Sequence, residues 1–328
     1  MIVDKCTCLR RQDMKTALER LLDFFYIEDE NGVSNIDRVN RYQKILRRVE
    51  TTDKNKSVEA VGNSETNGDI PNGIIMEGGK IIGLGIHIYN EDVYPLKSFE
   101  INLRSCELIG GLDISDCTDM VFLDLYHNKI TSVKSNNLPS MRIFGVQDNM
   151  LESLDVSEMP LCQGIDAGMN RLKEIDVSRN SELVELYIND NDFTGIDISH
   201  NNKLKYFYCH NNRISELDTR ANPLLRHLNA TGNPMKSIRS LAPQKDGNLP
   251  LELYAGDGGC VGLKFNPVYN AQWKETGEWQ QSYYAYPDEG CRFVGWFENG
   301  TKVSEEEMWT DEYGASRILK ALFEKKQR

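Results

Sequence analysis

The chain lacks an excess of positive charge. Its 328 residues include 38 Lys and Arg against 50 Asp and Glu, which gives a formal net charge of −12. Binding to a nucleic-acid backbone, or to an anionic membrane surface through a polybasic patch, depends on the opposite balance. We therefore expect neither nucleic acid nor a charged lipid surface as the partner.

Long apolar runs are also missing. No segment approaches the roughly 18 consecutive apolar residues that a transmembrane helix needs. The opening sequence MIVDKCTCLRR carries four charges and no apolar signal core. We expect no membrane insertion and no Sec signal within this sequence. With 40% apolar residues, the chain is nevertheless long enough for a packed core and two or three domains.

The sequence also lacks the signatures of catalysis and metal binding. It contains no GxSxG, HExxH or P-loop motif, and no GxGxxG between a strand and a helix. The eight cysteines form no CxxC pair, and the five histidines are scattered. We expect no enzymatic activity, no catalytic residues, no cofactor and no metal site.

What the sequence does contain is an asparagine that recurs every 21 residues. The residues five and three positions before it and two positions after it are apolar or small, so the unit reads L-x-L-x-x-N-x-L. One unit earlier Cys106 stands in the same place, with a one-residue insertion at Gly110–Gly111. A short fixed period of this kind indicates a solenoid. The ladder positions are Cys106, Asn128, Asn149, Asn170, Asn191, Asn212 and Asn233.

This unit resembles the leucine-rich repeat in the short form found in internalin-like bacterial surface proteins, and seven units match over residues 99–240. The resemblance implies a mainly β solenoid, wound as a right-handed superhelix. Alternating L-x-L turns two side chains inward from a short strand, and stacked strands bury a face that one unit cannot bury alone. A carboxamide at the bend that follows can satisfy buried backbone groups, so we expect a structural role for the asparagines. We also expect Cys106, Cys162 and Cys209 to be buried small hydrophobes.

A second motif, Leu/Ile-Asp-Val/Ile-Ser, lies on the return side of each unit and is too short for a helix. We expect an extended segment there, with one aspartate per unit in a column spaced about 5 Å apart. Each carboxylate is expected to accept local backbone N–H bonds and to face solvent. A string of calcium sites is the alternative. The column consists of Asp113, Asp155, Asp176, Asp197 and Asp218.

The N-terminal part has a different pattern. Apolar stripes at helical spacing predict amphipathic helices over 11–26 and 35–50, and the polar, turn-rich segment 51–72 reads as a mobile linker. The apolar segment 74–86, interrupted by Gly78–Gly79, predicts a hairpin that starts the stack. We assign 1–72 to a helical cap and linker and 73–255 to the solenoid with its hairpin.

Composition changes again near residue 256, because all four tryptophans lie beyond residue 270. The segment that runs from Tyr283 through GCRFVGWFENG to Phe323 resembles the divergent B-repeat of internalin-like proteins, which implies a small β-rich, β-grasp-like module over 256–328. Asn299-Gly300 predicts a hairpin turn, and Trp296 is expected in the core. Cys260 and Cys291 fall in strands that we expect to pair, which leaves a disulfide open if the protein is secreted.

The outward positions of the strands form three columns, and aromatic residues gather at two places in them. Tyrosine and histidine bury a large surface area on binding and lose little side-chain conformational entropy, because they have few rotatable bonds. These positions are therefore candidates for partner binding. They are Tyr187, Tyr206, Tyr208, His210 and His227 in one group, and Phe122 and Tyr126 in the other.

We therefore expect a non-catalytic recognition protein that binds a protein or peptide, on a host or a neighbouring cell, through the concave strand face. The resemblance implies a cell-surface or secreted location. Two alternatives stay open, namely a cytosolic scaffold that uses the same face and a surface module that binds glycans.

Overall fold

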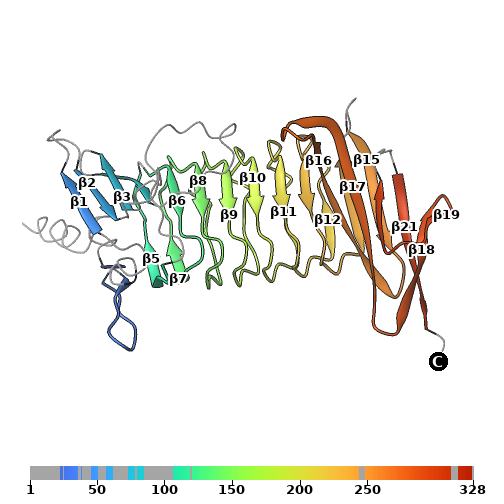
Figure 1. Cartoon of the computed structure of the whole chain (residues 1–328), viewed down its shortest axis with the longest axis horizontal. Coiled ribbons are helices and arrows are strands. Elements are labelled where there is room, and N and C mark those ends of the chain that lie inside the picture. The colour runs from blue at the N-terminus through green and yellow to red at the C-terminus, as the bar shows by residue number, and fades with distance from the viewer. Residues whose placement is uncertain are drawn as a thin grey trace, which may run out of the picture. The chain divides into compact units, whose positions relative to one another are not determined.

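The computed structural model describes residues 23–24, 26–35, 38, 46–50, 57–61, 73–77, 80–84, 106–118, 120–243, 248–311 and 317–326. The chain divides into two compact units, residues 1–159 and 160–328, and each is treated by itself. Figure 1 shows the strands of both units and labels most of them. Most residues of the two predicted helices, 11–26 and 35–50, lie outside the described residues. No helix bounds are therefore given for either segment.

Two strands near the N-terminus differ from expectation. β1 (Leu46–Glu50) and β2 (Ser57–Val61) pair antiparallel, with Val49 opposite Val58. The end of the predicted helix over 35–50 and part of the predicted linker over 51–72 are therefore strands. The physical reason is that the valines in both segments favour a pleated pair.

The predicted hairpin before the repeats is confirmed. β3 (Gly73–Glu77) and β4 (Lys80–Leu84) are antiparallel, and Glu77 is the Cα partner of Lys80. Leu84 of β4 then pairs in parallel with Leu123 of the first short repeat strand. The hairpin and the repeat strands thus belong to one continuous sheet.

In unit 1 the repeats form two parallel pairs. On the strand face, β6 (Phe122–Asp124) pairs with β8 (Ile143–Gly145). On the return side, β5 (Ile109–Asp113) pairs with β7 (Lys129–Lys134), and its register shifts between Gly110 and Gly111. The shift falls at the one-residue insertion that the repeat frame requires.

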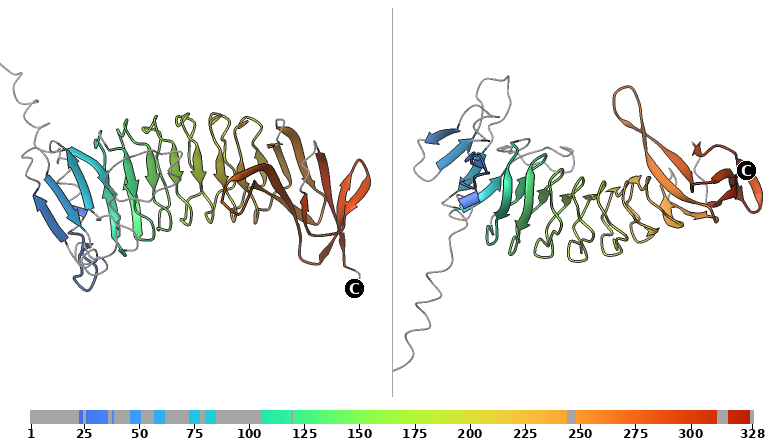
Figure 2. Two further views of the ribbon diagram at one scale, coloured as in Figure 1. Left: turned by 45° about the horizontal axis from the view of Figure 1, so that its top comes forward. Right: turned by 90° about the horizontal axis from the view of Figure 1, so that it is seen from below.

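In unit 2 the strand face is a run of parallel three-residue strands. They are β9 (Gly164–Asp166), β10 (Glu185–Tyr187), β11 (Tyr206–Tyr208) and β13 (His227–Asn229), and each residue pairs with the one 21 positions later. The left-hand view in Figure 2 shows these strands side by side. On the return side β12 (Glu216–Asp218) pairs with β14 (Ser237–Ala242) at the same 21-residue offset.

The core follows the L-x-L pattern. The central residue of each strand points inward, and Leu123, Phe144, Ile165, Leu186 and Phe207 are all fully buried. The cysteines predicted to behave as small hydrophobes, Cys106, Cys162 and Cys209, are also fully buried. Burial raises the pKa of the Cys209 thiol far above its usual range, so this side chain is inert packing.

The ladder asparagines join neighbouring coils through their carboxamides. Asn191 Nδ2 donates to the Ala167 carbonyl 3.0 Å away in the coil before, and its Oδ1 accepts the Leu172 N–H at 2.9 Å. Asn149, Asn212 and Asn233 make the corresponding bonds 24 and 19 residues back. The backbone N–H of Cys106 donates to Oδ1 of Asn128, which is the ladder residue of the next coil. One side-chain type thus closes the bend in each of these coils.

The residue before each ladder asparagine adopts the left-handed conformation. The φ values are 56° at His127, 55° at Asp148, 52° at Met169, 54° at Asp190 and 55° at Asn211. Asn, Asp and His tolerate this region because their short polar side chains bond locally, whereas methionine does not.

A second asparagine column, which the sequence reading did not identify, closes the return turn in unit 2. Asn180, Asn201 and Asn222 are buried, at 0%, 0% and 1% exposure. Asn201 Nδ2 donates to the carbonyls of Val177 at 3.0 Å and Asn180 at 2.9 Å, and Asn222 repeats this one coil later.

Both sheets of unit 2 continue past the repeats. β13 pairs antiparallel with β16 (Gly259–Tyr269), which leads to β17 (Glu275–Pro287) and β20 (Met308–Asp311). β14 pairs with β15 (Leu249–Ala255), which leads to β21 (Arg317–Lys325), β18 (Cys291–Glu298) and β19 (Thr301–Ser304). The described residues after 256 contain strands and no helix, so a β-grasp arrangement is not seen among them.

Two details of the C-terminal strands match the sequence prediction and one does not. Asn299 and Gly300, with φ of 50° and 80°, make the tight turn between β18 and β19, and Trp296 is fully buried. Cys260 and Cys291 are free thiols, opposite Tyr286 and Lys325 respectively. The expectation that their strands pair is wrong, because β16 and β18 belong to different sheets.

Candidate functional site

The strand face of unit 2 carries the aromatic group that the sequence predicts. Because side chains alternate along a strand, the first and third residues of β10, β11 and β13 point away from the core. We call Tyr187, Tyr206 and Tyr208 the tyrosine cluster. All three are half-buried, and His210 and His227 lie next to it on the same face.

The rings of this face contact one another across the strands. Tyr187 and Tyr208 are Cα partners on β10 and β11, with ring centroids 5.1 Å apart in an edge-on arrangement. Tyr206 stacks on His227, with centroids 4.4 Å apart and ring planes 19° from parallel. Tyr208 meets His210 edge-on at 6.3 Å. These contacts hold the rings in place and so lower the conformational entropy cost of ordering them when a partner binds.

Both histidines of the face are held in the neutral form. Burial lowers the pKa of His227 to about 4, and burial also lowers the pKa of His210, against the opposing effect of Asp190 at 3.7 Å. His227 is only 7% exposed, and its Nε2 has no hydrogen-bond partner. Neither imidazole therefore adds positive charge near neutral pH.

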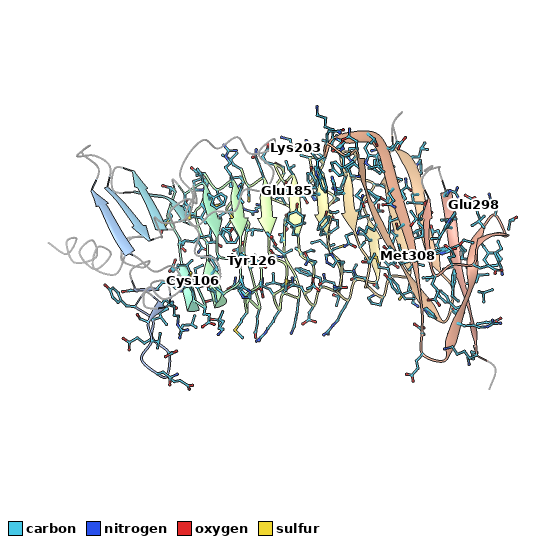
Figure 3. The ribbon with its side chains drawn as sticks, viewed as in Figure 1. Cys106, Tyr126, Glu185, Lys203, Glu298 and Met308 are labelled. Atoms are coloured by element: carbon cyan, nitrogen blue, oxygen red, sulfur yellow. The ribbon has the colours of Figure 1, made fainter. Side chains whose placement is uncertain are left out.

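A buried carboxylate lies within the face. Glu185, labelled in Figure 3, is the first residue of β10 and is 2% exposed, with Gly164 on one side and Tyr206 on the other. Burial raises its pKa to about 7, a hydrogen bond with Tyr187 acts in the opposite direction, and the charge of Asp166 raises it further. Asp166, the Cα partner of Tyr187, is 5% exposed. The sequence reading placed Glu185 at an outward position but gave it no role.

The β16–β17 hairpin extends this face at one edge. Its tip carries Tyr269, 41% exposed, and Trp273, 85% exposed. Arg226, just before β13, lies 5.4 Å from the centre of the Trp279 ring and forms an ion pair with Glu275. The right-hand view in Figure 2 shows the orange hairpin extending beyond the neighbouring strands. Burial raises the pKa of Tyr208, and Tyr269 and Glu185 raise it further.

The smaller aromatic group belongs to unit 1. Phe122 is 7% exposed, so it offers little surface, whereas Tyr126, labelled in Figure 3, is half-buried. Tyr126 lies 5.8 Å from His127 by ring centroids, and His127 Nδ1 forms a hydrogen bond with Asp148 Oδ2. This group is thus less aromatic and less exposed than the tyrosine cluster.

The return-side aspartates make the local bonds expected of them. Oδ1 of Asp113, Asp155, Asp176 and Asp197 accepts the N–H of the serine two residues later, at 2.9 to 3.0 Å. In the last coil Asp218 bonds to Arg220 instead. These bonds lower the pKa values of Asp176, Asp197 and Asp218. The aspartates are turn formers, as the sequence reading predicted.

Two features are absent from the described residues. No group of three or more His, Cys, Asp or Glu within them is arranged to hold a metal ion. No helix in the described part of the chain is both long and apolar enough to cross a membrane.

Comparison with known proteins gives structural likeness only. No protein-family model matches the chain, and no curated protein matches it. A leucine-rich repeat protein from Leptospira interrogans is 16% identical, with 45% of this chain and 52% of that chain covered and a TM-score of 0.34. The functional domain of InlJ from Listeria monocytogenes, which includes a cysteine ladder, is 14% identical, with 58% and 50% covered and a TM-score of 0.27.

A third similar structure is the leucine-rich repeat ectodomain of the plant receptor kinase GASSHO1/SCHENGEN3 from Arabidopsis thaliana, in complex with CASPARIAN STRIP INTEGRITY FACTOR 2. It is 13% identical, with 60% of this chain and 26% of that chain covered and a TM-score of 0.34. The chain thus spans about half the length of the two bacterial structures and about a quarter of the plant one. The chain's 21-residue coils and asparagine ladder agree with the leucine-rich repeat pattern that its sequence resembles.

Proposed function

We propose that the protein is a non-catalytic recognition protein that binds a protein or peptide through the strand face of unit 2. The observation that carries the proposal is the tyrosine cluster, in which three half-buried rings are fixed by contacts with one another and with two neutral histidines. Fixed aromatic side chains with a polar tip dominate the binding energy of interfaces. Phe122 and Tyr126 form a second, weaker candidate surface. A location at the cell surface or outside the cell is part of this proposal.

The test uses the full chain and a matched triple variant, Tyr187→Ala/Tyr206→Ala/Tyr208→Ala. Proteins captured by cross-linking from host and bacterial extracts are compared between the two, after circular dichroism has shown that both fold. We expect a specific partner that the wild type captures and the triple variant loses. Retention of that partner by the triple variant would direct attention to the C-terminal strands.

Glycan binding is the second candidate, because stacked rings beside neutral polar side chains also suit sugars. A glycan array probed with the wild type and the triple variant separates the two. Signals that depend on the three tyrosines would favour the glycan.

A further inference from the structure

Resting on the proposed function, we infer that the tyrosine cluster is a subsite for an arginine side chain of the partner, with the carboxylates of Glu185 and Asp166 supplying the negative field. Four side chains from two adjacent strands make the subsite: Glu185 and Tyr187 from β10, and Tyr206 and Tyr208 from β11. Asp166 enters from β9, beside Tyr187.

The outward positions of the repeat strands in this face carry charge of one sign. The first and third residues of β9, β10, β11 and β13 include Asp166 and Glu185 and no Lys or Arg. The outward position two residues after each strand, which is Gly168, Asn189, His210 or Thr231, is not Lys or Arg either. Lys205 and Arg226 precede β11 and β13 at one edge, where Glu275 forms an ion pair with Arg226. The exposed Lys264 on β16 is the Cα partner of Asn229, and its charge adds to the effect of burial in lowering the pKa of His210. The influences on Glu185 are burial, Tyr187 and Asp166, none of which is a cation.

A buried carboxylate without a cationic neighbour is an unstable arrangement near neutral pH. It takes up a proton or gains a counter-ion, since burial penalises the charged form. Here its pKa is raised to about 7, so both outcomes are accessible near neutral pH. A bound guanidinium would favour the ionised form and release the proton to solvent.

The aromatic rings select among cations. A guanidinium is planar and weakly hydrated, so it stacks on a tyrosine face better than the compact ammonium of lysine does. The free Nε2 of His227, on a ring stacked against Tyr206, adds an unpartnered polar atom to the same face. Because that imidazole is neutral, it does not repel the ligand.

The experiment selects a random peptide library, displayed on phage, against the full-length protein at about pH 8. We expect the enriched peptides to share an arginine, and its replacement by citrulline, which has the same shape without the charge, to weaken binding about tenfold. Glu185→Gln should produce a similar loss. Asp176→Asn, which removes one negative charge on the return side, should change affinity less than about twofold.

Proton linkage gives a second readout, the dependence of binding affinity on pH. Binding of an arginine peptide free of histidine should weaken about tenfold between about pH 8 and pH 6, as Glu185 takes up its proton. The dependence should disappear in Glu185→Gln. Affinity that is independent of pH in the wild type, or equal affinity for a lysine version of the peptide, would overturn the inference.

Failure of the inference can be told from failure of the proposed function. Peptides without a shared arginine that still depend on Tyr206 and Tyr208 would refute the arginine subsite and leave the recognition face standing. Peptides that bind equally well to the triple tyrosine variant would refute both.

Discussion

The repeats of the two units close their return turns with different chemistry. The equivalent positions, 21 residues apart, are Cys117, Leu138 and Met159 in unit 1 and Asn180, Asn201 and Asn222 in unit 2, and all six are buried. The turn is similar in both, because Met120 and Leu183 each donate an N–H to the carbonyl of this position. In unit 2 the carboxamides add two bonds to the coil before.

This difference shows that one backbone turn can be stabilised in two ways. Apolar side chains fill the space without specifying a partner, whereas a buried carboxamide holds only if the neighbouring carbonyls are in register. The coils that carry the tyrosine cluster are therefore the ones whose register is fixed on both the strand side and the return side.

The largest expected effect comes from exchanging the two chemistries. Leu138→Asn should lower the free energy of unfolding by about 4 kcal/mol, because it loses apolar burial and places Oδ1 among Cys117 and Met159. Asn201→Leu should cost about 2 kcal/mol, since two carbonyls lose a donor. Urea denaturation measures both. A Leu138→Asn cost below about 1 kcal/mol would show that unit 1 accepts the carboxamide and would break the comparison.

Glu185 predicts a pH effect that belongs to unit 2. Its pKa is 4.5 unfolded and about 7 folded, so the folded chain holds this proton between those values. The stability that this group contributes is full below pH 4.5 and is lost as pH rises to 7, by about 3 kcal/mol. Glu185→Gln should therefore be more stable than the wild type at pH 8, and this advantage should shrink at pH 5. Parallel melting curves at both pH values would contradict this.

The asparagine ladder should be equally important in both units. Asn149→Leu and Asn191→Leu each remove a donor and an acceptor that serve the preceding coil, and should each cost about 2–3 kcal/mol. Asn170→Leu should cost a similar amount. Ser199→Ala, exposed on the return side, is the control and should cost far less. Small, equal shifts in melting temperature for all four would show that the carboxamides do little.

Partner binding should separate the aromatic groups of the two units. Tyr206→Ala and Tyr208→Ala should each weaken binding of the captured partner by about 1–3 kcal/mol while the fold persists. Asp176→Ala on the return side is the control and should leave affinity unchanged, and Tyr126→Ala in unit 1 should have a smaller effect than either tyrosine of unit 2. A loss with Tyr126→Ala of the same size would mean that both units contribute to recognition.

The smallest effect concerns backbone strain. Met169 occupies the left-handed column at φ 52° and is 44% exposed, so little packing depends on it. Met169→Asn, which copies Asn211, should raise the free energy of unfolding by about 0.5–1 kcal/mol. Asn211→Met is the reverse control and should lower it by a similar amount.

The repeat pattern predicted most of the fold because its period and its burial have the same cause. A residue that returns every 21 positions meets its own equivalent across the coil, so the L-x-L core, the insertion at Gly110–Gly111 and the return aspartates were all readable from the sequence. The second column, Asn180, Asn201 and Asn222, has the same period but only three members, and its equivalents in unit 1 are apolar.

Other features depended on long-range contacts that the sequence does not encode locally. The strands β1 and β2 arise from pairing between segments whose own patterns suggest a helix and a linker. The burial of Glu185 depends on its position between Gly164 and Tyr206 on other coils and on the neighbouring tyrosines. The position of the β16–β17 hairpin beside the repeat strands depends on how β16 joins β13. None of these has a signature within one segment of the chain.

The ladder bonds have an evolutionary consequence. Each described carboxamide reaches only its own coil and the one before, so a 21-residue segment copied between Asn191 and Asn212 would meet the same carbonyls and amides on both sides. Duplication or deletion of a whole unit therefore keeps every ladder bond, whereas a change of another length shifts the strand register, as the one-residue insertion at Gly110–Gly111 does between β5 and β7. The recognition face can gain or lose one row of three side chains in a single genetic event.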